Sequence, residues 1–307
     1  MAGLQDVDMA RLHEAALDET TLDWLTDRIT DALARGEQVT PAALLLLLRR
    51  FATTAREDMA EPLGAALARE VDRLAEHEHD GDREGWIVVF SEAAAVSDDP
   101  RLPRATVDLL EELRPRWSSH PGDGAPGPNA VDAVMRSIEA CLLSVNVPEA
   151  RALAAEAIDA LERVVAGAYR PGQGISHEIA KAAFVRGGLS DHVRSASTLL
   201  TAHMLTARLP YAMLADELMQ SVLRTPPAEP DDGDARFTLN CELARVFGRL
   251  AALHRDEEYR RTAVLAVGED YAADAARTLA ALAPSVRTRG VEAAAFGLAL
   301  AEWLNLQ

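Results

Sequence analysis

Residues 40–54 read TPAALLLLLRRFATT, and residues 57–74, which read EDMAEPLGAALAREVDRL, follow them after a short turn. Thr40 is a good N-cap residue, and Pro41 suits the first position of a helix. The first segment is apolar around most of its circumference, whereas the second is charged at helical spacing. The pair therefore predicts a helical hairpin with one buried helix and one amphipathic partner.

The same unit recurs along the whole chain. Mostly apolar helices are expected to begin near residues 40, 84, 129, 191, 236 and 290. Each of the first five is followed by a charged, amphipathic segment; the fifth partner covers residues 257–283. The sixth apolar helix has no partner after it. An unpaired amphipathic segment, TLDWLTDRITDALA at residues 21–34, precedes the first unit and can pair with the last helix.

This pattern predicts an all-α protein, an (α/α)6 toroid of six helical hairpins with the apolar helices inside and the amphipathic helices outside. An open α-solenoid is the alternative, and it would leave a helix exposed at each end. Few stretches alternate β-branched or aromatic residues with polar ones, so a sheet is not expected. We expect one domain over residues 1–307, with a poorly determined arm at 1–20. The Gly- and Pro-containing stretches 118–128 and 224–235 are expected to be exposed linkers.

The chain carries a formal net charge of −18 at pH 7. A surface this negative repels phosphate backbones and anionic lipid, so neither nucleic acid nor a membrane is an expected partner. The leucine run at residues 44–48 is far too short to span a bilayer. Cys141 and Cys241 lie in apolar helical segments and outside any CxxC pair. Together with an N-terminus that does not read as a signal peptide, they predict a cytoplasmic protein.

Residues 190–304 contain an apolar helix, a charged helix and a final helix of the form AxxxALAEWL at 295–304. This succession resembles the closing repeats of the thioredoxin-linked toroid proteins of the spermatogenesis-associated-20 type, in the six-hairpin toroid superfamily. It is more distantly similar to the N-acylglucosamine 2-epimerase group. The likeness is one of helix rhythm: no CxxC module precedes it, and residues 190–194 read SDHVR where the thioredoxin-linked group has Pro-Ser-Gly-Asn. The resemblance implies a toroid that handles a sugar-like small molecule at one mouth.

In a toroid the inner helices share one direction, so their N-termini meet at one mouth, where backbone N–H groups and helix dipoles favour anions. Asp191 and His192 open the fourth apolar helix and could act there as acid and base. Alternatively, they are a helix cap and a surface residue of the first turn.

Three glutamates recur at similar points of apolar helices: Glu92 in SEAAAV, Glu139 in IEACLL and Glu242 in CELARV. Carboxylates that line a central cavity would raise one another's pKa, which suits general acid catalysis. Alternatively, each glutamate pairs with an arginine, because a buried charge needs a partner. The candidate partners are Arg136, Arg245 and Arg249.

His177 and Arg186 lie in the irregular insert at residues 170–189, the longest departure from the repeat. Loops often carry function, although an ordinary connecting helix is the alternative here. Three residues near the starts of apolar helices would join them as substrate-binding side chains: Trp86, Asn129 and Asn240.

Motifs for cofactors and metals are missing. The string EHEHDGD at residues 76–82 has metal-binding residue types without a ligand spacing, so a solvated loop is expected. No GxGxxG, Walker, GxSxG or HExxH pattern occurs. We therefore expect no metal and no cofactor, and the sequence leaves open whether the protein is an enzyme. The two functions that it suggests are a ring that binds or processes a sugar-like molecule and a non-enzymatic interaction or scaffold protein with a protein partner.

Overall fold

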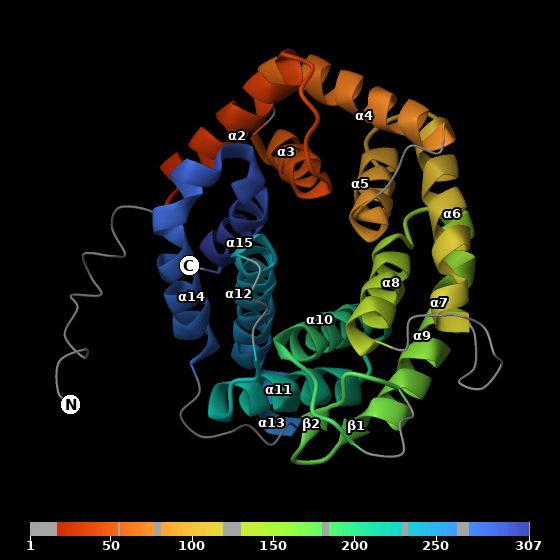
Figure 1. The fold of residues 1–307 in the computed structure, drawn as a ribbon, viewed down its shortest axis with the longest axis vertical. Coiled ribbons are helices and arrows are strands. Elements are labelled where there is room, and N and C mark those ends of the chain that lie inside the picture. The colour runs from red at the N-terminus through yellow and green to blue at the C-terminus, as the bar shows by residue number, and fades with distance from the viewer. Residues whose placement is uncertain are drawn as a thin grey trace. The chain divides into compact units, whose positions relative to one another are not determined.

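The computed structural model describes residues 17–54, 56–76, 81–118, 130–179, 184–228, 233–262 and 270–306. Nearly all of the elements in these ranges are helices, and the two strands found there have two residues each (Figure 1). The prediction of an all-α protein is therefore confirmed. The chain divides into two compact units, which are described one at a time below.

The first unit contains the described residues of 17–66, 233–255 and 270–306. Its elements are α2 (Glu19–Ala34), α3 (Pro41–Thr54), η1 (Glu57–Met59), α12 (Gly233–Arg255), α14 (Tyr271–Arg289), η2 (Gly290–Ala293) and α15 (Ala294–Leu304). Helix α15 packs against both α3 and α12, and α14 covers α12 and α15. Helix α2 packs on α3, η2 and α15, so the unpaired amphipathic segment does contact the last helix of the chain.

The close packing of α15 on α2 and α3 depends on a small residue. A Cβ atom at Gly297 would lie 2.5 Å from Cδ2 of Leu46 and 3.1 Å from Cδ1 of Leu25. Both leucines are fully buried. The leucine run that decides the hairpin thus meets a glycine of the last helix, which lets the two helices approach closely.

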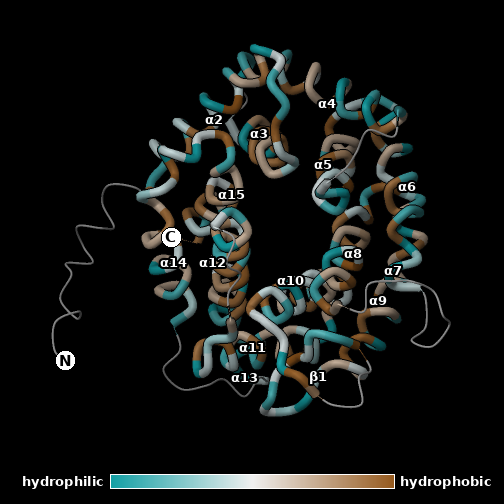
Figure 2. The backbone as a smooth tube through the Cα atoms, in the orientation of Figure 1, coloured by the Kyte–Doolittle hydropathy of each residue, from teal (hydrophilic) through white to brown (hydrophobic). Residues whose placement is uncertain are grey.

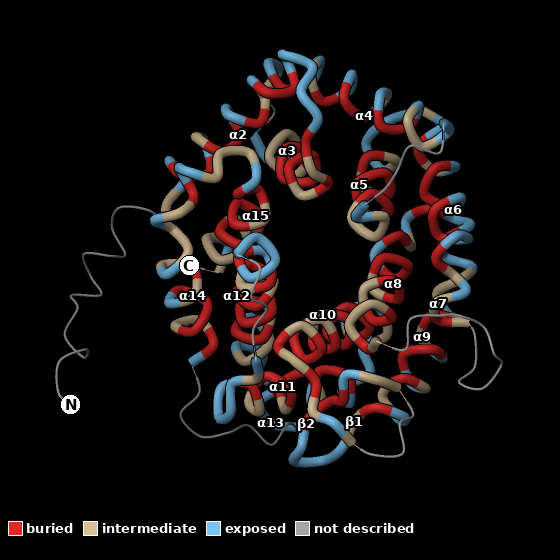
Figure 3. Tube along the Cα trace, viewed as in Figure 1, coloured by how far each residue is buried: buried red, intermediate tan, exposed pale blue. Residues whose placement is uncertain are grey.

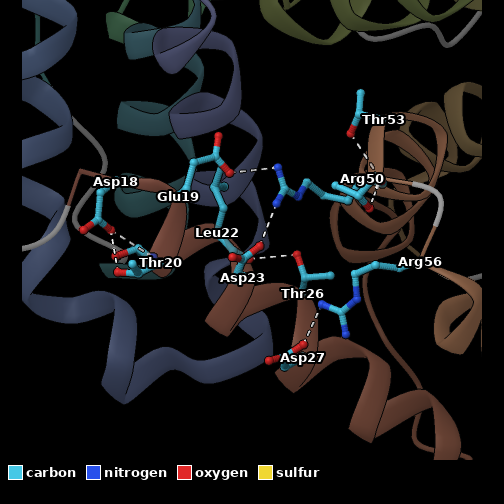
Figure 4. Close-up of polar contacts among 12 residues, drawn as sticks. Asp18, Glu19, Thr20, Leu22, Asp23, Thr26, Asp27, Arg50, Thr53 and Arg56 are labelled. Carbon is cyan, nitrogen blue, oxygen red and sulfur yellow. Dashed lines mark hydrogen bonds and ion pairs between the residues drawn. The ribbon is translucent and has the colours of Figure 1, made fainter.

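Charged side chains join α2 to the end of α3 (Figure 4). Glu19, Asp23 and Asp27 recur every fourth residue along α2, so they share one face. Arg50 donates to Glu19 at 3.0 Å and to Asp23 at 2.7 Å, and Arg56 donates to Asp27 at 2.7 Å. This row of ion pairs holds the exposed side of α2 while its apolar side is buried.

The second unit contains the described residues of 67–228 and 256–262, and α4 (Ala60–Ala75) spans the boundary between the two units. Its other elements are α5 (Arg83–Ala94), α6 (Arg101–Leu113), α7 (Pro115–Ser118), α8 (Val131–Leu143), α9 (Pro148–Ala168), β1 (Tyr169–Arg170), β2 (Gly174–Ile175), α10 (Leu189–Thr206), α11 (Leu209–Arg224) and α13 (Glu257–Thr262). Helix α8 contacts both α5 and α10. Each of these three helices packs against the helix that follows it, α6, α9 or α11.

The predicted hairpins therefore form in this unit with an apolar and an amphipathic layer. Helix α6 buries one side and exposes the other, with hydrophilic positions along its exposed side (Figures 2 and 3). Helix α5 buries six of its 12 residues, and α8 buries eight of its 13.

One predicted helix is divided in two. Residues 257–283 were expected to form a single partner for the fifth apolar helix, but α13 ends at Thr262 and α14 begins at Tyr271. A new helix starts there because Asp270 caps it by accepting from the backbone N–H of Ala273 at 3.0 Å. Helix α13 is held separately: the hydroxyl of Tyr259 donates to the buried Asp216 of α11 at 3.2 Å.

Both cysteines are buried and free, Cys141 in α8 of the second unit and Cys241 in α12 of the first. Burial raises the pKa of both thiols, which keeps them protonated near neutral pH. Of the two predicted linkers, 118–128 lies outside the described residues except for Ser118. The described part of 224–235 is mostly exposed, and α12 begins within it at Gly233.

Candidate functional site

The irregular insert after α9 positions the candidate site of the second unit. Strands β1 and β2 pair antiparallel, and β2 packs against α10 and α11. The main chain of His177 then bonds in two directions: its N–H donates to the carbonyl of Val185 at 3.2 Å, and its carbonyl accepts from the N–H of Val131 at 2.9 Å. The insert is thereby attached to the first residue of α8, and the imidazole of His177 lies beside the start of α10.

His177 and Asp191, which lie 14 residues apart, form a hydrogen-bonded pair. Nδ1 of His177 is 3.0 Å from Oδ2 of Asp191 and 3.3 Å from Oδ1. The carboxylate also accepts from the backbone N–H groups of Gly188 at 2.8 Å and of Asp132 at 3.2 Å. Asp191 thus receives donors from the N-terminal ends of α8 and α10 and from the insert.

Burial differs sharply within this pair. Asp191 has no exposed surface, whereas the side chain of His177 is 52% exposed. The carboxylate accepts from two backbone N–H groups and, when ionised, has no hydrogen to donate, so Nδ1 of His177 carries the hydrogen of their bond. The other ring nitrogen, Nε2, is then the one that can accept a proton from a solute.

Neighbouring charges shift the pKa values of both His177 and Asp191. The hydrogen bond to Asp191 raises the pKa of His177, and the charges of Asp191, Asp132 and Glu178 act in the same direction. Burial raises the pKa of Asp191, while its bond to His177 opposes that rise. Arg194 donates to Asp132 at 2.9 Å, which balances the second carboxylate of the group.

His192, the other residue predicted at this helix start, faces away from solvent. It is fully buried, and its Nδ1 lies 2.8 Å from the carbonyl oxygen of Gly188. A Cβ atom at Gly174, where φ is +86°, would lie 2.5 Å from Nε2 of His192. Burial lowers the pKa of His192, so the imidazole is neutral and packs beneath the insert.

Arg186 holds the far end of the insert on α11. Its Nη2 donates to the carbonyl oxygens of Ser221 at 3.1 Å and Thr225 at 2.8 Å, at the C-terminal end of that helix. A cation is favoured there by the helix dipole. Arg186 is therefore placed to fix the insert in position.

The remaining predicted residues of the second unit do not join the His177–Asp191 pair by any described hydrogen bond. Glu139 accepts from the hydroxyls of Ser197 at 2.6 Å and Thr201 at 2.9 Å. Trp86 is 6% exposed and stacks on Phe90 with the ring centroids 5.7 Å apart. Glu92 is half-buried in α5.

Two predicted residues lie in the first unit, and one lies outside the described residues. Asn240 and Glu242 are half-buried on α12, and Asn240 donates to the carbonyl of Arg236 at 3.0 Å. Asn129 falls outside the described residues, as do residues 77–80 of the EHEHDGD string.

Sequence reasoning missed the partners that complete two polar groups. Asp132 was readable as an acidic residue in the first turn of α8, and Arg194 follows Asp191 by three residues on one helix face. Glu302 in ALAEWL is a further glutamate inside an apolar helix. It accepts from Arg49 at 3.1 Å and from Arg245 at 2.7 Å.

The described residues hold neither a metal-ligand cluster nor a membrane-spanning helix. No three side chains of His, Cys, Asp or Glu come together there as a metal site would require. No helix in those ranges has the length and apolar character needed to cross a bilayer. Comparison of the sequence with protein-family models and with curated proteins finds no match.

Proposed function

We propose that the chain is a six-hairpin toroid that binds a small polar molecule at His177, with the imidazole as proton acceptor and Asp191 as the group that positions it. The observation that carries this proposal is the pairing of a fully buried carboxylate with a half-exposed histidine. A histidine needed only for packing would gain nothing from a buried carboxylate that fixes its tautomer. Histidines that transfer protons are commonly oriented by such a partner.

The toroid is supported by contacts at the two ends of the chain. Helix α15 packs against α3, and α2 packs against α15. An open α-solenoid in chain order separates its first and last repeats, whereas closure brings them together. Small-angle X-ray scattering tests this: a compact chain of this length has a radius of gyration of about 19 Å. A clearly larger value with an elongated distance distribution would favour the solenoid.

The functional test is a thermal-shift screen of the full chain against a metabolite library that includes sugars and divalent metal ions. A hit at the proposed site is expected to be lost in His177→Asn, because the shorter side chain cannot reach the solute. The matched control is His203→Asn, which removes a half-buried histidine near the other end of α10. A hit that survives His177→Asn, or is lost equally in the control, would contradict the assignment.

A non-enzymatic scaffold is the second candidate, and one observation favours it. Met204, Leu205 and Met213 are 65%, 44% and 37% exposed around the turn between α10 and α11. Exposed apolar side chains that gather on a surface commonly mark contacts with other proteins. A metabolite screen without any hit would favour this function over ligand binding.

A further inference from the structure

A second acceptor lies close to the imidazole of His177. Nδ1 of His177 is bonded to the buried Asp191, which leaves Nε2 as the acceptor of a side chain that is 52% exposed. Asp132 is beside this pair, because its backbone N–H donates to Oδ1 of Asp191 at 3.2 Å. Its side chain is 20% exposed, and Oδ2 accepts from Arg194 at 2.9 Å. No hydrogen bond to Oδ1 of Asp132 is found among the described residues, so this oxygen can accept from a ligand.

Negative charge exceeds positive charge around this imidazole. The bond to Asp191 and the charges of three carboxylates raise the pKa of His177, which shows that its surroundings favour a cation. The three carboxylates belong to Asp132, Glu178 and Asp191. Arg194 balances Asp132, so two negative charges remain while the imidazole is neutral. A cationic ligand is therefore attracted to this place, and an anionic ligand is repelled.

The helix ends at the site are already compensated by the chain itself. The N-terminal ends of α8 and α10 would otherwise favour an anion. Two of the backbone N–H groups there, those of Asp132 and Gly188, donate to the carboxylate of Asp191. The chain's own carboxylate thus occupies the position that an anionic ligand would take.

We infer that the ligand bound at His177 is a cation, a small molecule whose ammonium group donates to Nε2 of His177 and is attracted by the carboxylates of Asp132 and Glu178. An ammonium group has three N–H donors and no acceptor, so it suits a site that offers lone pairs. The formal net charge of −18 attracts such a molecule from a distance as well. The inference rests on the proposed binding site at His177 and names the class of its ligand.

The test compares three polyols that share one carbon skeleton and differ in charge. Glucamine carries an ammonium group, sorbitol is neutral, and gluconate is an anion. The full chain is titrated with each by isothermal calorimetry at pH 8 and equal ionic strength, a pH that favours the neutral imidazole while an alkylammonium group stays protonated. Saturable binding is expected for glucamine, about fivefold tighter than for sorbitol, and gluconate is expected not to bind.

Substitutions of the two carboxylates test the attraction directly. Asp132→Asn and Glu178→Gln are each expected to weaken the binding of glucamine about fivefold, with a smaller change for sorbitol. His177→Asn is expected to abolish the binding of both. The matched control is Glu156→Gln in α9, which removes an equal charge from a carboxylate that pairs with Arg114 and is 30% exposed. This variant is expected to bind glucamine as the unsubstituted chain does. If Asp132→Asn does not fold, Glu178→Gln carries the test.

The inference and the proposed site fail in different ways. The inference is overturned if glucamine does not bind, if it binds no more tightly than sorbitol or gluconate, or if neither carboxylate substitution changes its affinity. The site at His177 is overturned when a bound molecule of any charge still binds to His177→Asn. A neutral or anionic library molecule that is lost in His177→Asn would keep the site and overturn the cation.

Discussion

Replacement of Asp191 by alanine should destabilise the second unit strongly, while replacement of its partner His177 should not. The carboxylate accepts from the backbone N–H groups of Gly188 and Asp132 and from His177, and it has no exposed surface. Alanine would leave both backbone donors without their acceptor, at a cost of about 1–3 kcal/mol each. The imidazole is half-exposed and can bond to water instead.

Part of this cost is offset because the alanine variant no longer buries the charge of Asp191. Burial disfavours that charge, as the raised pKa of Asp191 shows. The net loss expected for Asp191→Ala is therefore about 3 kcal/mol. Asp191→Asn keeps one acceptor oxygen and turns an amide donor toward the other N–H, so about 2 kcal/mol is expected. His177→Ala should cost less than about 1 kcal/mol, as for an exposed ion pair.

Urea unfolding at pH 7, followed by circular dichroism, measures the difference between these variants. Ligand binding at His177, if the screen finds it, should be lost in both Asp191→Asn and His177→Ala. A loss below about 1 kcal/mol in Asp191→Ala would refute the reasoning, because stranded backbone donors could not then be present. A loss in His177→Ala as large as in Asp191→Ala would show that the imidazole itself supports the fold.

Two further predictions concern the backbone of α10 and its histidines. Ala207 follows the last residue of α10 with φ at +54°, a left-handed conformation that is strained for alanine, so Ala207→Gly should stabilise the protein by about 1 kcal/mol in urea unfolding. The control Ala152→Gly, on the exposed side of α9, should destabilise it by a similar amount. A change of the same sign in both variants would contradict backbone strain at Ala207. Burial lowers the pKa of His192 below its ordinary value of 6.5, and a histidine that stays neutral when folded makes stability fall as pH drops below 6.5. His177 has a raised pKa, and its contribution is present below 6.5 and is lost as pH rises through the folded value. The stability lost on acidification from pH 7.5 to 5.5 should therefore shrink in His192→Asn and grow in His177→Asn, and unchanged curves would count against both.

The hairpins α5–α6, α8–α9 and α10–α11 could be predicted from the sequence because in each the apolar helix differs in pattern from its partner. The leucine run of α3 is buried and α2 buries one side of its surface, as these local patterns predict. The break between α13 and α14 could not be predicted in the same way. Residues 257–283 read as one helical segment, whereas Asp270 lies outside the helix and caps α14, and Tyr259 of α13 contacts Asp216 of another repeat.

The candidate site was predictable only in part, for a similar reason. Asp191 and His177 were identified singly, from a helix start and from an irregular insert, but their contact depends on how the insert folds onto α8 and α10. His192 is adjacent to Asp191 in sequence and equally buried, yet its imidazole lies against Gly174 and the carbonyl of Gly188 and not against His177. Glu139 and Glu302 both lie inside apolar helices, and only tertiary packing brings the hydroxyls of α10 to Glu139 and the guanidinium groups of Arg49 and Arg245 to Glu302.

The placement of the two cysteines has a practical consequence. One thiol lies in each unit, and both are inert toward alkylating reagents for as long as their helices stay packed. Modification of the unaltered chain during brief exposure to such a reagent, read by mass spectrometry of the two peptides, therefore reports opening of each unit on its own. The modification rates of Cys141 and Cys241 therefore show whether the two units unfold together or one after the other.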